Sequence, residues 1–172
     1  MPPTLTRLSA SFARSVQLMS DYSTYEEELQ KNGKIIHTNV GTSMMPLLRQ
    51  NRDVMIIERP NGRLKKYDAP LYKRKNGQYV LHRILKVREH DYVICGDHCV
   101  NKEYGITDEQ IIGVLTGVIR DGKVISVDSF GYKLYYHLWC DFFYVRVTIL
   151  RIKFFLRRVG SAIKRRLVGN KK

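Results

Sequence analysis

Short apolar runs with turn signals between them recur from residue 34 to residue 127. Many of these runs alternate apolar and polar positions or contain β-branched residues, as strands with one buried face do. The predicted strands include residues 34–40, 54–58, 78–87, 92–95, 111–119 and 123–127. Asn76-Gly77 predicts a hairpin with a type I′ turn, and Asp121-Gly122 marks a second hairpin. We therefore expect a mostly β domain, a small barrel or sandwich of short antiparallel strands.

A helical pattern precedes these strands. Residues 21–31 are typical of a short helix, in which Ser23 and Glu26 have the spacing of a capping box and Asn32-Gly33 is a stop signal. Residues 1–20 have only faint periodicity and are interpreted as an irregular lead-in. The predicted organisation is a lead-in with a short N-terminal helix over 1–33, a β domain over 34–130 and a helical tail over 131–172.

The C-terminal tail has a different periodicity. From residue 142 onward, apolar residues recur at steps of three or four, at 145, 149, 152, 156, 159, 163 and 167, and Arg146, Lys153, Arg157 and Lys164 flank them. This pattern predicts a basic amphipathic helix of the kind that lies in a membrane interface. Two alternatives remain open: the stripe packs on the β domain, or the alternation over residues 145–149 belongs to a strand.

The charge of the chain is concentrated in this tail. The 172 residues carry a formal charge of +14, and residues 131–172 hold eleven Lys and Arg against one acid, Asp141. The other 130 residues carry nineteen against fifteen. A charge of this kind indicates an anionic partner. We expect an anionic membrane surface, bound through residues 142–172, rather than nucleic acid.

Cysteine usage and hydropathy bear on the compartment. The three cysteines are an odd number without the spacing of a disulfide framework, which favours a reducing compartment. The first thirty residues contain no apolar core of a secretory signal, and no apolar run reaches the ~18 residues of a membrane span. The prediction is a protein that is cytoplasmic or peripheral on the cytoplasmic face of the membrane.

Candidate chemistry is concentrated at a serine that follows the first predicted strand. Ser43 comes at the end of this strand, directly before two methionines and Pro46. A serine hydroxyl becomes a nucleophile only when a base removes its proton, and His82, in the predicted strand 78–87, is the candidate base. The segment Cys95–Cys99 holds two thiols and an imidazole but has no second pair at zinc-site spacing. We expect no metal and no cofactor.

Three short motifs in this order resemble the type I signal peptidase family of serine endopeptidases. They are Gly41-Thr42-Ser43-Met44-Met45-Pro46, then Leu81-His82-Arg83-Ile84, then Gly96-Asp97, and the resemblance covers roughly residues 34–127. The closer likeness is to the branch with a Ser/His pair, as in endoplasmic-reticulum and archaeal signal peptidases, because the bacterial branch has a lysine where this chain has His82. The resemblance implies a signal-peptidase/LexA-like β domain.

The resemblance also implies roles for individual residues. Ser43 would be the nucleophile and His82 the general base. In the Ser/His branch, an aspartate six positions beyond the Gly-Asp aspartate completes the site, and that position is Glu103 here. Glu103 is favoured over Asp97, which is the second candidate. The Ser43 amide would stabilise the oxyanion, and the Thr42 hydroxyl would replace a family serine at the position of Gly41.

The sequence therefore predicts a serine endopeptidase that cleaves leader or signal-type peptides or preproteins. The alternative is a non-catalytic signal-peptidase-like binding module whose basic tail binds an anionic membrane or nucleic acid. A self-cleaving repressor-type peptidase shares the serine turn, but it normally uses a lysine base and a DNA-binding domain, for which some thirty irregular N-terminal residues are too few.

Overall fold

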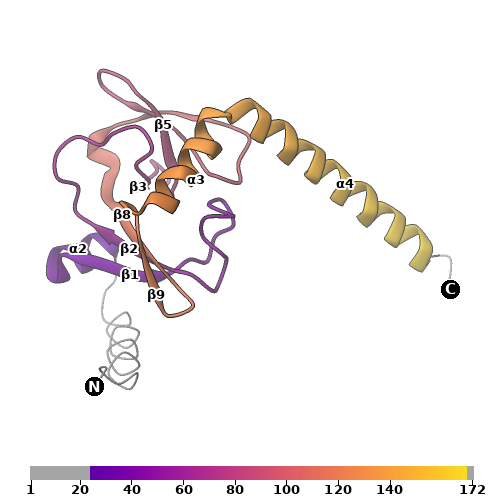
Figure 1. Ribbon diagram of the computed structural model, residues 1–172, viewed down its shortest axis with the longest axis horizontal. Coiled ribbons are helices and arrows are strands. Elements are labelled where there is room, and N and C mark those ends of the chain that lie inside the picture. The colour runs from indigo at the N-terminus through magenta and orange to yellow at the C-terminus, as the bar shows by residue number, and fades with distance from the viewer. Residues whose placement is uncertain (1–23, 170–172) are drawn as a thin grey trace.

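The computed structural model describes residues 24–169, with side chains as far as residue 161. It shows a mostly β domain with one helix before the strands and two helices after them (Figure 1). The strands lie between Lys34 and Ser126 and form two antiparallel sheets. The prediction of a mostly β domain of short antiparallel strands is confirmed.

The strands divide unequally between the two sheets. The larger sheet has the order β1-β2-β8-β3-β4, with β9 paired to β8, and the smaller sheet has the order β5-β6-β7. The larger sheet contains β1 (Lys34–Thr38), β2 (Val54–Glu58), β3 (Pro70–Lys73), β4 (Tyr79–Leu81), β8 (Ile111–Arg120) and β9 (Lys123–Ser126). The smaller sheet contains β5 (Arg83–Val87), β6 (Tyr92–Cys95) and β7 (Glu103–Ile106), and a 3₁₀ turn, η1 (Asp108–Gln110), leads from it into β8.

Two apolar clusters form the core. The first lies on the larger sheet and includes Met44 and Leu48, which are fully buried although they belong to the loop after β1. The second joins the two sheets, with Tyr72 from β3 against Ile84 and Tyr92 from β5 and β6. The loop that carries Ser43 thus shares a core with the larger sheet, which fixes this loop on the domain.

The strand predicted over residues 78–87 is interrupted at His82. The chain leaves the larger sheet after β4 and enters the smaller sheet with β5, and His82 is the residue between them. Its amide still donates to the Pro70 carbonyl at 3.3 Å. The periodicity could not reveal this break, because β4 and β5 are both extended and both contain buried apolar residues, Val80 and Leu81 before it and Ile84 after it.

The two predicted hairpins form, but the type I′ turn occurs at Asp121-Gly122 and not at Asn76-Gly77, where it was predicted. Asp121 and Gly122 both have positive φ, 48° and 77°, as a type I′ turn between β8 and β9 requires. In the hairpin of β3 and β4, only Gly77 has positive φ, and the Gly77 amide donates to the Arg74 carbonyl. The type I′ assignment at Asn76-Gly77 is therefore wrong, because the five residues 74–78 connect the strands and this longer connection does not require a positive φ at Asn76.

The N-terminal helix α2 (Tyr25–Asn32) begins slightly later than predicted. Its N-cap is Thr24, whose hydroxyl accepts from the Glu27 amide at 3.2 Å. The N-cap is thus one residue later than the capping box expected at Ser23 and Glu26, and Ser23 lies outside the described residues. The helix ends at Gly33, which has a left-handed φ of 72° as predicted for a stop.

The C-terminal tail consists of two helices, α3 (Phe130–Asp141) and α4 (Phe143–Gly169), separated at Phe142. Helix α3 lies on the β domain, whereas α4 extends away from it (Figure 1). The strand alternative over residues 145–149 is wrong, because these residues are helical. Among the helices of the described chain, none combines the length with the apolar character needed to cross a bilayer.

Candidate active site

Ser43 lies in a long loop between β1 and β2 that is closed at its base by backbone hydrogen bonds. The Asn39 amide donates to the Asp53 carbonyl at 2.9 Å, and the Asn51 amide donates to the Asn39 carbonyl at 2.7 Å. The Asn39 side chain donates to the Gly41 carbonyl at 2.8 Å. Because Met44 is buried directly after it, Ser43 is held half-buried at the loop surface.

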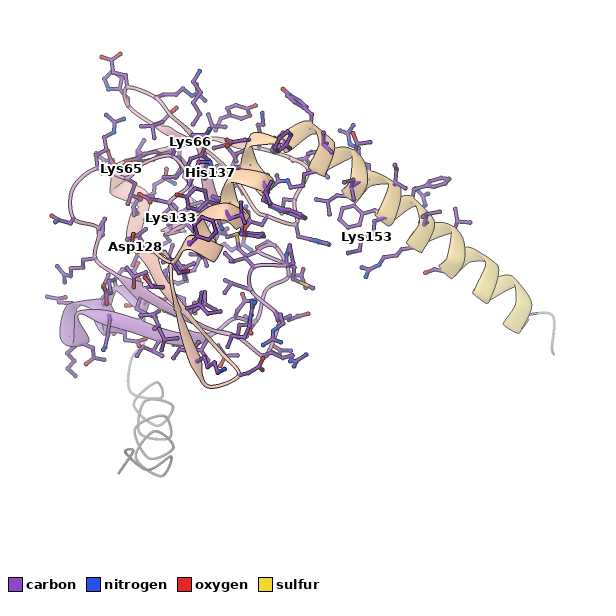
Figure 2. All side chains as sticks on the ribbon, in the orientation of Figure 1. Lys65, Lys66, Asp128, Lys133, His137 and Lys153 are labelled. Atoms are coloured by element: carbon purple, nitrogen blue, oxygen red, sulfur yellow. The ribbon has the colours of Figure 1, made fainter. Side chains whose placement is uncertain are left out.

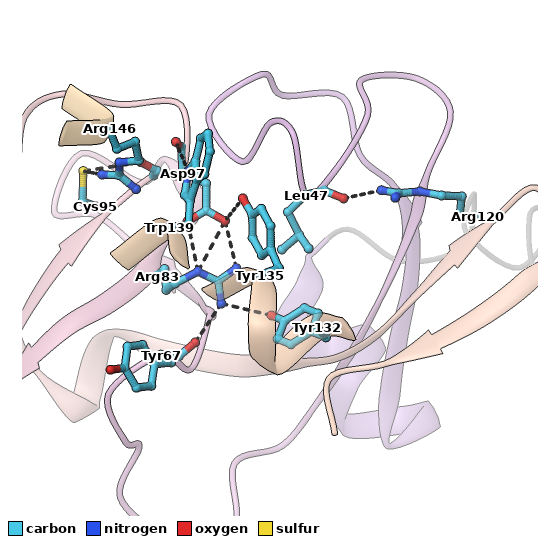
Figure 3. Close-up of polar contacts among 11 residues, drawn as sticks. Leu47, Tyr67, Arg83, Cys95, Asp97, Arg120, Tyr132, Tyr135, Trp139 and Arg146 are labelled. Atoms are coloured by element: carbon cyan, nitrogen blue, oxygen red, sulfur yellow. Dashed lines mark hydrogen bonds and ion pairs between the residues drawn. The ribbon is translucent and has the colours of Figure 1, made fainter. Parts of the chain in front are cut away.

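A buried carboxylate stabilises the far end of this loop. Asp53 is fully buried and accepts from the Arg49 amide and from the guanidinium groups of Arg49 and Arg120. Burial alone would raise the pKa of Asp53, but the hydrogen bonds from the two arginines outweigh it and hold the pKa at about 2. Arg120 also donates to the Leu47 carbonyl inside the loop (Figure 3). The loop therefore has a fixed charged anchor at neutral pH.

Gly96 marks the point where the serine loop meets the histidine. A Cβ on Gly96 would lie 2.6 Å from the Ser43 carbonyl oxygen and 2.9 Å from His82 Nε2. The Ser43 carbonyl also accepts from the His98 amide at 2.7 Å, which ties the loop to the turn that follows β6. Only glycine leaves room for this approach. The fold thus brings the Ser43 backbone and the Nε2 side of His82 to the same point.

Glu103 holds the opposite nitrogen of the imidazole. Its Oε1 lies 3.0 Å from His82 Nδ1, and Glu103 is the first residue of β7, on the smaller sheet. A proton on Nδ1 can be donated to this carboxylate, which leaves Nε2 as the acceptor on the side of Gly96. This is the orientation that a histidine base needs.

The surroundings of His82 favour its neutral form. The ring is 5% exposed. Burial lowers the pKa of His82 below its usual range, and the opposing charge of Glu103 compensates only in part. At neutral pH the imidazole is therefore uncharged and can accept a proton.

The Ser43 hydroxyl and the imidazole do not yet form a hydrogen bond. Among the described residues, Ser43 Oγ has no hydrogen-bond partner, so it is free to rotate about its Cα–Cβ bond. Catalytic hydrogen bonds are often long or absent in enzymes without substrate and tighten when substrate binds.

Two neighbours of the Glu103 carboxylate were not predicted from the sequence. Arg74 makes a bidentate ion pair with Glu103, with its Nε 2.9 Å from Oε2. The Tyr72 hydroxyl lies 3.4 Å from His82 Nδ1. Burial alone would raise the pKa of Glu103, but Arg74 and Tyr72 outweigh it and lower the pKa. The i,i+2 spacing of Tyr72 and Arg74 places both on one face of an extended chain, which is the only signal the sequence gives.

Asp97, the second candidate for the third residue, belongs to a buried ion pair instead. Its carboxylate accepts from Arg83 Nε at 3.0 Å and Nη2 at 2.8 Å, and both side chains are fully buried. Tyr135 and Trp139 of α3 donate to the carboxylate and to the carbonyl of Asp97 (Figure 3). Within the described residues no hydrogen bond joins Asp97 to His82. The geometry favours Glu103 beside His82, and Asp97 fixes α3 on the domain.

A cleft of about 470 Å³ contains Ser43 and His82. Its walls come from the residues after β1 and from β4, which is an edge strand of the larger sheet. The lining is mostly apolar, with Arg74 and Gln78 at polar positions; the apolar residues are Val40, Met44, Met55, Leu71, Val80 and Leu81. A larger groove of about 640 Å³ between α2 and the η1 region is lined by no Ser, Thr, Cys or His among the described residues.

The donors expected for an oxyanion are only partly defined. Among the described residues, the Ser43 amide has no hydrogen-bond partner, so it can donate to a substrate. Thr42 is exposed, and its carbonyl accepts from the Met45 amide at 3.1 Å. The Thr42 hydroxyl therefore stays a prediction as the second donor.

Cys95 and Cys99, which lie near the site, have different surroundings. All three cysteines of the chain are free. Burial raises the pKa of Cys95 to about 11, whereas Cys99 lines the cleft. His98 packs against Phe154 of α4, with ring centroids 5.3 Å apart. In the region that the structure describes, no three His, Cys, Asp or Glu side chains form a group that could hold a metal ion.

Comparison with family models, with curated proteins and with solved structures finds no match. A functional assignment therefore depends on the geometry of these side chains.

Proposed function

We propose that this chain is a serine endopeptidase with Ser43 as nucleophile, His82 as general base and Glu103 as the residue that orients His82. The observation that supports it most is the two-sided arrangement of the imidazole. Nδ1 lies 3.0 Å from Glu103, and Nε2 lies at Gly96 beside the Ser43 backbone. A neutral base with a fixed tautomer next to a loop serine is what acyl transfer requires.

In the proposed reaction, Ser43 Oγ attacks the scissile carbonyl carbon while His82 Nε2 takes the hydroxyl proton. The Ser43 amide donates to the oxyanion, and the Thr42 hydroxyl is the second proposed donor. His82 then gives its proton to the leaving amine, and the C–N bond breaks to leave an acyl-enzyme. A water molecule, deprotonated by His82, hydrolyses the ester and restores Ser43.

The cleft supports an extended peptide as substrate. Strand β4 has β3 as its only partner within the described residues, so its other edge can pair with a peptide strand beside His82. We propose leader or signal-type peptides, cleaved after a small residue, on a domain of the signal-peptidase/LexA-like fold. We place the enzyme in the cytoplasm or on the cytoplasmic face of the membrane, with no cofactor required.

The direct test replaces Ser43 by alanine. Parent and Ser43→Ala proteins are incubated with a mixture of leader-type peptides that carry small residues, and new termini are detected by mass spectrometry. We expect cleavage by the parent and a loss of at least about 10⁴-fold in the variant, because no other activated hydroxyl lies in the cleft. Ser161→Ala, an exposed serine of α4, is the matched control and should cleave like the parent.

The competing function is a non-catalytic binding module on the same fold. The missing hydrogen bond between Ser43 Oγ and His82 is the observation that favours it. If parent and Ser43→Ala bind extended peptides equally and neither cleaves them, the module is the better description. Equal cleavage by both proteins would contradict Ser43 as the nucleophile.

A further inference from the structure

Helix α4 presents two different apolar faces. One face, with Val147 and Leu150, is buried, and Phe154 on the same face packs on His98 of the β domain. The residues of the second face follow each other at steps of three or four and lie about half a helical turn away from the first. We call this second face the outer stripe; it contains Val145, Ile149, Ile152 and Leu156, which are 55–61% exposed.

The outer stripe cannot be covered by the domain to which the helix belongs. The helix uses its opposite face for that contact, and beyond its first turns it extends away from the domain (Figure 1). The alternative in which the stripe packs on the β domain is therefore wrong for the described part of α4. Residues 163 and 167 of the pattern lie outside the described side chains. An exposed apolar row of this length marks an interaction surface.

Cationic side chains flank one edge of the outer stripe. Lys153 and Arg157 lie along this edge, whereas Arg151 and Arg158 lie further round the helix, well away from the stripe, and all four are exposed. Figure 2 shows side chains projecting from both sides of the helix, with Lys153 labelled. From Phe143 to Gly169 the sequence contains no Asp or Glu. The partner of this surface must therefore provide apolar depth in the middle and negative charge beside it.

We propose that the outer stripe of α4 docks on an anionic phospholipid surface, with the helix parallel to the membrane plane. The apolar residues enter the boundary between headgroups and acyl chains, and the flanking cations contact lipid phosphates. A second copy of this chain is a poorer occupant, because two such helices would bring like charges together without an acid to neutralise them. The docking does not depend on the proposed peptidase activity.

Docking would also place the candidate active site near the lipid. Phe154 of α4 packs on His98, and the His98 amide donates to the Ser43 carbonyl. Arg146 is buried under the same turn, with its Nη2 3.4 Å from the Cys99 carbonyl. The first turns of α4 are therefore in contact with the segment that supports the serine loop. A membrane-bound helix would thus hold the cleft at a fixed position relative to the membrane surface.

The test is co-sedimentation of the full chain with vesicles of phosphatidylcholine, with or without phosphatidylglycerol. We expect binding to the anionic vesicles and little to the neutral ones. Ile152→Ser with Leu156→Ser keeps the charge and should weaken binding about tenfold or more. Lys153→Gln with Arg157→Gln keeps the stripe and should weaken binding to anionic vesicles about tenfold. Val124→Ser removes an exposed aliphatic residue of β9 and should bind like the parent.

Three results would overturn the docking proposal. One is parent-like vesicle binding by Ile152→Ser with Leu156→Ser, with helix content unchanged by circular dichroism. Another is a dimer that this double variant abolishes, together with no binding of the parent to vesicles, which would make a second copy the occupant. The third is affinity for duplex DNA but not for anionic vesicles.

Discussion

His82 and Arg83 are neighbours in sequence, yet they make two opposite kinds of carboxylate contact. His82 faces Glu103, and the two side chains are 6% and 26% exposed at the edge of the cleft. Arg83 faces Asp97, and both side chains are 0% exposed. Successive residues of an extended chain point to opposite sides. The change of sheet between β4 and β5 thus directs the His82 side chain towards the cleft and the Arg83 side chain into the core.

The difference in burial decides what each pair can do. Burial alone would lower the pKa of Arg83, but Asp97 outweighs it and keeps the pKa well above the usual range, so this charge does not change in any accessible pH range. Burial lowers the pKa of His82, which leaves it neutral and able to exchange a proton. If the proposed function is correct, the buried pair is structural and the cleft pair chemical, and three substitutions can test this division.

Asp97→Asn should have the largest effect, and the effect should be on stability. It leaves the Arg83 guanidinium buried without a counter-charge and weakens the contacts to α3, a loss of about 3–5 kcal/mol in the free energy of unfolding. Denaturant unfolding followed by tryptophan fluorescence measures this, because Trp139 donates to the Asp97 carbonyl at 2.7 Å.

Glu103→Gln is the matched control in the same unfolding experiment. It removes one carboxylate of a partly exposed pair and should cost about 1 kcal/mol or less. If both substitutions destabilised the protein equally, the distinction between a structural and a chemical carboxylate would not hold.

In a cleavage assay Glu103→Gln should have a larger effect than Asp97→Asn, the reverse of their effects on stability. Glu103→Gln should lower kcat/KM about 10²-fold, less than for a buried triad carboxylate because water can reach this site. Glu103 raises the pKa of His82 against the effect of burial, so its removal lowers that pKa further. Activity requires neutral His82 and is lost as pH falls through its pKa, which lies below the usual value of about 6.5. The fall of kcat/KM on the acid side of its pH profile, which we call the acid limb, should therefore move to lower pH.

The pH profile separates this role from a merely structural one. A folded Glu103→Gln protein with parent-like kcat/KM, or with an unmoved acid limb, would contradict the contact between Glu103 and His82. Folded Asp97→Asn, assayed under conditions that keep it native, should show a much smaller loss of kcat/KM than Glu103→Gln.

Local patterns in the sequence predicted most of the strands, though not β7, and several turns, because alternation and turn residues act within a few positions. Asp121-Gly122 and Gly33 are examples in which the backbone φ of one or two residues is decisive. The break at His82 could not be predicted in this way. It depends on which sheet each half of the strand joins, and that is determined by pairing with β3 on one side and β6 on the other.

The candidate site shows the same limit. Ser43, His82 and Glu103 could be proposed from short motifs, and the structure brings Glu103 to His82. The contact of Arg74 with Glu103 joins the end of β3 to the start of β7, which lie in different sheets. Likewise, the sequence defined the apolar stripe of α4 but not which face of the helix packs, since Val147 and Leu150 are as apolar as the stripe.

Arg74→Gln should have the smallest effect of the three substitutions. It should shift the pH dependence of kcat/KM in the direction opposite to Glu103→Gln. The Arg74 charge lowers the pKa of His82, so its removal should raise that pKa and move the acid limb of kcat/KM to higher pH, opposite to Glu103→Gln. The shift should be about one pH unit or less, because Arg74 is 32% exposed and water screens its charge. Lys75→Gln, the adjacent cation outside this contact, should leave the limb in place. Shifts of the same sign for Arg74→Gln and Glu103→Gln would mean that the two residues do not act on His82 as an oppositely charged pair.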